Sequence, residues 1–168
     1  MDAPHGTTIL DVSDPAQPRI LAQINLEDAH EHSHKVRVVG DLMCTNLERP
    51  NRRFAAKAPL YREAHAALEK EHGRPPTRAE LARKLSVNES QVALLEEWSH
   101  TGFERAGFRV WDIADRTKPK LITHVKTGGV GVHRFDVDER YAYISTGMDG
   151  YGGNILVNYD VTNPARPE

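Results

Sequence analysis

One short segment recurs along this chain, and its recurrence constrains the fold more than any other feature of the sequence. Residues 9–21 (ILDVSDPAQPRIL) reappear as residues 110–122 (VWDIADRTKPKLI) and begin again as residues 158–168 (NYDVTNPARPE). In every copy a proline follows the first aspartate by seven positions. Self-similarity of this kind indicates a chain built from one repeated supersecondary unit.

Each copy has the pattern of a strand, a tight turn and a second strand. Apolar residues flank the first aspartate, and an Asp-Pro or Asn-Pro pair favours the turn in two copies, whereas the second copy has Asp115-Arg116. We expect Asp11, Asp112 and Asp160 to bind the turn backbone rather than to act in catalysis, because Asx side chains accept hydrogen bonds from backbone ahead of them.

Two further strands are predicted after each of the first two copies. Residues 34–38 (HKVRV) and 133–137 (HRFDV) alternate apolar and polar side chains, and the apolar segments 42–45 and 141–145 follow them. One period therefore contains about four strands, the content of a β-propeller blade. Asp112 and Asp160 are 48 positions apart, which suits one blade of about 40–50 residues.

The longer interval between the first two copies, 101 positions, indicates an insertion. Residues 54–100 are rich in helix-forming residues, and their apolar positions have helical spacing. We expect helices over residues 57–72, 78–85 and from 86 to about 98. Two S/T-x-x-E capping boxes, at residues 77–80 and 86–89, would open the second and third helices.

The predicted fold is mainly β. We expect a partial β-propeller of about two four-stranded antiparallel blades and the start of a third, with an inserted three-helix segment. The predicted boundaries are a first blade region at 1–53, a helical insert at 54–101, a second blade region at 102–157 and the start of a third blade at 158–168. An incomplete propeller exposes edges and apolar faces, so we expect missing blades or self-association to supply its partner.

Residues 11–18 (DVSDPAQP) and their two later copies resemble the LVIVD-type repeat of bacterial β-propellers. Residues 32–41 and 129–135 are similar to the same family, and the resemblance covers about 70% of the chain. It implies a propeller that acts as a binding scaffold, with a small-molecule ligand as one candidate.

Residues 73–88 of the insert resemble the helix-turn-helix of sigma-factor region 3, which implies nucleic-acid binding. The charge of the insert argues against this function, because residues 54–100 contain seven Lys or Arg and seven Asp or Glu, whereas nucleic-acid readers carry a basic excess. Docking of a protein partner is the alternative role for these helices.

Histidines are the strongest candidates for a functional site, and five of the nine lie at positions 30, 32, 34, 124 and 133. His34 and His133 occupy equivalent repeat positions, and His32 shares one face of a strand with His34. We predict that His32, His34 and His133 bind a divalent transition metal: iron, copper or zinc. The alternative is that these histidines cap strand ends or bond loop carbonyls.

Iron-dependent propeller oxygenases use a similar ring of histidines, which makes a metal-dependent oxidoreductase the alternative function. The sequence leaves open whether the chain is an enzyme, because it has no Ser-His-Asp spacing, phosphate loop or CxxC pair. The glycine run at residues 127–131 predicts close approach of the backbone to a ligand or partner.

Composition sets the remaining bounds. The formal net charge is −2, and no apolar run approaches the roughly 18–20 residues of a membrane span. The first residues do not resemble a signal peptide, so we expect a cytoplasmic protein. The single cysteine, Cys44, excludes an intrachain disulfide.

Overall fold

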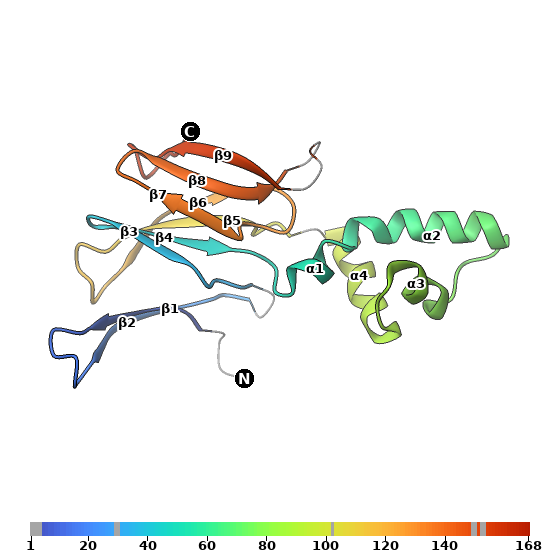
Figure 1. The fold of residues 1–168 in the computed structure, drawn as a ribbon, viewed down its shortest axis with the longest axis horizontal. Helices are drawn as coiled ribbons and strands as arrows, with labels where there is room; N and C mark the ends of the chain where they lie inside the picture. The colour runs from blue at the N-terminus through green and yellow to red at the C-terminus, as the bar shows by residue number, and fades with distance from the viewer. Residues whose placement is uncertain (1–4, 29–30, 102, 149–150, 152–153) are drawn as a thin grey trace. The chain divides into compact units, whose positions relative to one another are not determined.

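The computed structural model describes residues 5–28, 31–101, 103–148, 151 and 154–168. It divides into a β unit, formed by residues 1–50 and 105–168, and a helical unit, formed by residues 51–104. Within the described residues, the β unit contains three antiparallel sheets (Figure 1). The prediction of a mainly β chain with an inserted helical segment is confirmed. None of the described helices has the length and apolar character needed to cross a membrane.

The three sheets follow the order of the chain. The first contains β1 (His5–Asp11) and β2 (Arg19–Asn25). The second has the order β3 (Val36–Val39), β4 (Leu42–Leu47), β5 (Gly107–Asp112) and β6 (Lys120–Lys126). The third has the order β7 (Arg134–Val137), β8 (Tyr141–Gly147) and β9 (Asn154–Asp160).

The second sheet takes strands from both sides of the helical insert. β4 pairs with β5 from Leu42 opposite Asp112 to Leu47 opposite Gly107. The sheets therefore group the strands differently from the predicted blade regions 1–53 and 102–157. The physical reason is that the entropy cost of closing a loop rises slowly with loop length, so a long insert does not prevent two strands from pairing.

The repeated aspartates bind the turns as predicted. The Oδ1 atoms of Asp11, Asp112 and Asp160 accept hydrogen bonds of 2.9–3.0 Å from the backbone N–H two residues ahead. Asp14, Asp115 and Asn163 repeat this contact three residues later in each copy. The pKa of Asp11 is lowered to about 2, mainly because its carboxylate accepts a hydrogen bond from the backbone N–H of Ser13. One sequence motif thus forms the same turn three times.

Apolar clusters cover both faces of the second sheet. Phe108 and Val110 of β5 pack with Phe135 and Ile144 of the third sheet. The next residue, Trp111, points to the opposite face, where it belongs to a cluster that also receives Ile9 and Ile24 of the first sheet. The second sheet is therefore packed between the other two.

The helical unit contains α1 (Arg52–Ala55), α2 (Ala58–His72), α3 (Arg78–Leu85) and α4 (Glu89–Thr101). Leu81, Val92 and Leu95 are buried in it. The three predicted helices are present, and α1 is an additional turn too short to show a periodic pattern. The nucleic-acid binding that the resemblance of this segment to a sigma factor implies stays a prediction.

One of the two predicted capping boxes forms. Thr77 and Glu80 exchange the expected hydrogen bonds at the start of α3. The box predicted at residues 86–89 is wrong, because Ser86 ends α3 in a left-handed conformation (φ 52°). The start of α4 therefore moves toward the C-terminus, where the side chain of Gln91 accepts a hydrogen bond from the N–H of Asn88.

Candidate metal centre

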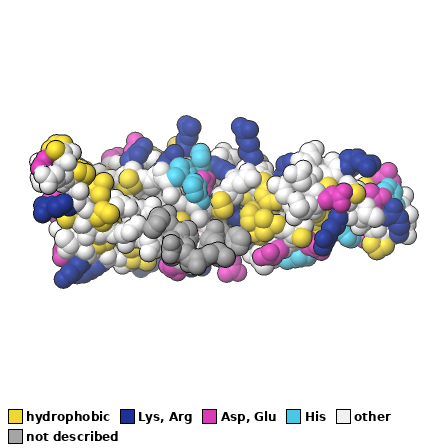
Figure 2. Space-filling view, turned by 90° about the horizontal axis from the view of Figure 1, so that it is seen from below, with side chains coloured by type: hydrophobic (Ala, Val, Ile, Leu, Met, Phe, Trp, Pro, Cys, Tyr) yellow, Lys and Arg dark blue, Asp and Glu magenta, His cyan; other side chains and the backbone are white. Residues whose placement is uncertain are grey.

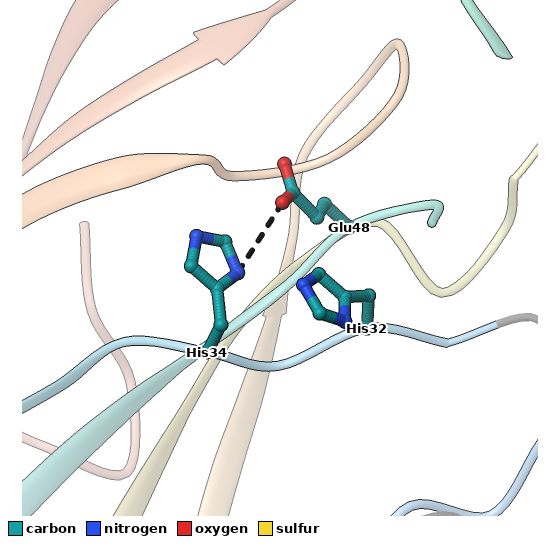
Figure 3. A group of neighbouring side chains, drawn as sticks. All are labelled: His32, His34 and Glu48. Carbon is teal, nitrogen blue, oxygen red and sulfur yellow. Dashed lines mark ion pairs between the residues drawn. The ribbon is translucent and has the colours of Figure 1, made fainter. Parts of the chain in front are cut away.

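Three imidazoles gather around one buried carboxylate in the β unit. His32 and His34 precede β3, His133 precedes β7, and Glu48 follows β4. Nδ1 of His133 lies 3.0 Å from each carboxylate oxygen of Glu48, and Nδ1 of His34 lies 3.3 Å from Oε1. One ligand atom from each of His32, His34 and Glu48 lies within 4.8 Å of the others (Figure 3).

The repeat brings two of these histidines together. β3 and β7 are the first strands of their sheets and contact each other, with an ion pair of 2.9 Å between Arg37 and Asp136. His34 and His133 therefore enter neighbouring strands side by side, with ring centroids 5.1 Å apart. The structure thus places all three predicted residues in one cluster, and their role as metal ligands stays a prediction.

The backbone fixes His32 beside Glu48. The N–H of His32 donates to the carbonyl of Glu48 at 2.8 Å, and the N–H of Glu48 donates back to His32 at 3.0 Å. The rings of His32 and His34 stack 4.7 Å apart, as expected for residues two positions apart in an extended segment. Figure 3 shows them on one segment of chain beside Glu48.

Asn46 links the segments that carry the histidines. Its side chain is fully buried, and its Oδ1 accepts hydrogen bonds from the N–H groups of His34 (3.0 Å) and Lys35 (2.9 Å). Its Nδ2 donates to the carbonyl of Val132 at 2.8 Å. Sequence reasoning missed this residue, although an asparagine within a strand is unusual enough to have marked it.

Gly131 lets the segment before His133 cross the end of β4. Its φ is +93°, and a Cβ atom there would lie 2.3 Å from the carbonyl oxygen of Leu47 and 2.7 Å from Cα of Glu48. Close approach of the glycine run to a ligand or partner stays a prediction. The described contact is with the chain's own strand.

The cluster combines a buried carboxylate with imidazoles, a set of side chains that could hold a metal ion. The Glu48 side chain is 4% exposed, and its ion-pair partners among the described residues are His34 and His133. Burial lowers the pKa of His34, although the charge of Glu48 opposes this shift, so the ring tends toward its neutral form. A buried carboxylate is costly without a positive partner, and a metal ion would provide one.

The cluster is open to solvent on the histidine side. The side chains of His34 and His133 are 24% and 37% exposed. Figure 2 shows a group of histidine side chains at the surface, next to an acidic side chain. Of the other candidates, His30 lies outside the described residues, and His124 lies in β6 opposite Arg109.

Glu48 is the second functional residue that sequence reasoning missed. It lies at the end of an apolar strand, and the neighbouring sequence contains no metal-binding spacing that includes it. Only the pairing of its backbone with His32 and the passage of Gly131 across it bring it to the histidines.

A family model described as the LVIVD repeat matches residues 2–25, which contain the first strand–turn–strand copy. This match supports the repeat family inferred from the sequence. No curated protein and no solved structure matches the chain.

Proposed function

We propose that this chain is a repeat-built β scaffold that binds a divalent transition metal ion through His32, His34, His133 and Glu48. The observation that carries the proposal is the convergence of imidazoles from two equivalent repeat positions on one buried carboxylate. Imidazole nitrogen and carboxylate oxygen form a ligand set suited to zinc, copper or iron.

The spacing of the donor atoms suits such an ion. Ligands at about 2.1 Å from a tetrahedral zinc ion lie roughly 3.4 Å from one another. The contacts from Glu48 to His133 and His34, 3.0 and 3.3 Å, already approach this value. One ligand atom each from His32, His34 and Glu48 lies within 4.8 Å of the others, and His133 contacts the same carboxylate at 3.0 Å.

We also propose that the stacked sheets form part of a β-propeller. The first strands of the second and third sheets contact each other, and successive sheets pack face to face. This arrangement is expected of neighbouring blades around a common axis. In such a propeller, equivalent loop positions, such as those of His34 and His133, would face the common axis.

Metal titration of the full chain tests the site. We expect stoichiometric binding of Zn²⁺, and of Co²⁺ with a visible absorption band that reports nitrogen and oxygen ligation. His34→Ala with His133→Ala should abolish the binding, and Glu48→Gln should weaken it strongly.

His65→Ala and His100→Ala are the matched controls, since both residues are in the helical unit. Circular dichroism of each variant checks its fold. Unchanged metal content in the folded His34/His133 variant would overturn the proposal. Oxidoreductase activity, a small-molecule ligand and a partner for the helices stay predictions. Identification of the bound metal is the first test of the oxidoreductase activity.

A further inference from the structure

Two valines on β3 lie at the surface although their repeat counterparts do not. Val36 and Val38 are 42% and 54% exposed. They follow His34 by two and four positions, just as Phe135 and Val137 follow His133 in β7. Phe135 is 6% exposed, and Val137 packs against the same cluster.

The difference arises from what covers the two strands. β7 contacts β3 and β4 of the preceding sheet, and these contacts shield its apolar side chains. The sheet that precedes β3 consists of β1 and β2 in the described residues. In the part of the chain that the structure describes, this sheet has no strands in the positions that β3 and β4 occupy in the second sheet.

β1 also differs from its repeat counterparts in how its edge is paired. The repeat aligns β1 with β5 and β9, because each carries the repeated aspartate at its end. β5 pairs with β4, and β9 pairs with β8, each on the side of the preceding hairpin. Among the described strands β1 pairs with β2 alone. Its other edge therefore has no strand partner among the described residues.

We propose that this surface docks an antiparallel β-hairpin of the kind formed by β3–β4 and β7–β8. One strand of the hairpin pairs with the free edge of β1, and the other covers Val36 and Val38. The backbone pairing supplies affinity, and an apolar face on the hairpin supplies selectivity. The packing of β7 on β3 and β4 is the template for this interface, so the proposal does not depend on the metal site.

The probe is a fluorescent peptide of residues 133–147 of this chain, which contain β7 and β8. Titration of the full chain, followed by fluorescence anisotropy, should show saturable binding that a scrambled peptide lacks. Hydrogen exchange should show slower exchange of β1 amides on binding, with unchanged exchange in β9.

Val36→Thr with Val38→Thr keeps the shape and strand preference of both side chains while it removes apolar surface. We expect this variant to weaken binding about tenfold or more. Leu156→Thr is the matched control and should have no effect, since Leu156 is 67% exposed on β9 in another sheet.

Three outcomes would overturn the proposal. One is the absence of saturable binding, and another is equal binding by the valine variant. The third is a dimer of the chain alone, seen by sedimentation, that the valine variant disrupts, because a second copy would then be the occupant.

Discussion

The two units of this protein bury different kinds of side chain. The helical unit packs leucine, valine, alanine and the aromatic residues Phe54, Tyr61 and Trp98, and Ser99 is its one buried polar residue among those described. The β unit buries Asn46 and Thr146 completely, and Glu31, Glu48 and Arg109 almost completely. Buried polar groups cost stability unless they are paired, so the pairing of polar groups constrains the β unit more than the helical unit.

The two units also differ in the sequence separation of the residues that contact each other. Thr77 and Glu80, which cap α3, are three residues apart. Asn46 and Val132 are 86 residues apart, and Glu48 and His133 are 85 apart. Substitutions in the two units should therefore differ in how much they lower the free energy of unfolding and in which parts of the chain they affect.

The largest expected effect is that of Gly131→Ala. The new Cβ atom would overlap the backbone of Leu47 and Glu48, and the residue would be held at φ +93°. We expect a loss of more than about 4 kcal/mol in the free energy of unfolding, measured by urea denaturation. Gly40→Ala is the control, because its φ is +59° but no atom lies within 4 Å of its Cβ position. It should cost about 1 kcal/mol, and equal costs for the two variants would contradict the crossing at Gly131.

Leu95→Ala should destabilise the helical unit by about 3 kcal/mol, because Leu95 is fully buried and the substitution leaves a cavity. In a Trp98→Phe background, Trp111 is the single tryptophan and reports the β unit. We expect the helical signal at 222 nm to melt at a lower temperature while the transition of Trp111 stays unchanged. A common shift of both signals would show that the two units unfold together.

Asn46→Ala should cost the β unit about 2 kcal/mol, since it leaves two partly buried N–H groups and one buried carbonyl without their partner. In the Trp98→Phe background, the unfolding transition reported by Trp111 measures this loss of stability. We also expect the segments of His34 and His133 to separate, which weakens metal binding if these histidines are the ligands. Asn88→Ala, at an exposed position of the helical unit, is the control and should leave the Trp111 transition in place.

The smallest expected effect is a loss of stability of the helical unit at low pH. Hydrogen bonds from Arg74 and from the N–H of Thr77 lower the pKa of Glu80 from 4.5 to about 2. Because the folded pKa is the lower one, this stabilisation is complete above pH 4.5 and is lost as the pH falls toward 2. Thermal melts of the helical signal between these values should show a decline that Glu80→Gln reduces. An equal decline in the variant would assign the acid sensitivity to other carboxyl groups.

Local sequence signals predicted the elements well. The three copies of the repeat form the same turn, the strand after each histidine occurs where alternation predicts it, and three of the helices occur in the predicted segment. The second capping box failed because Ser86 and Asn88 are both acceptable near a helix end, and only the path of the chain after α3 selects between them.

The sequence by itself determined the repeated strand–turn–strand units, the helical nature of the insert and the shared face of His32 and His34, because each depends on residues a few positions apart. The tertiary structure alone decided that β4 pairs with β5 across the insert. It also decided that Asn46 and Glu48 join the histidines and that Gly131 crosses β4. A strand pattern shows which side chains share a face but not which distant edge the strand meets, so these contacts follow only from the folded chain.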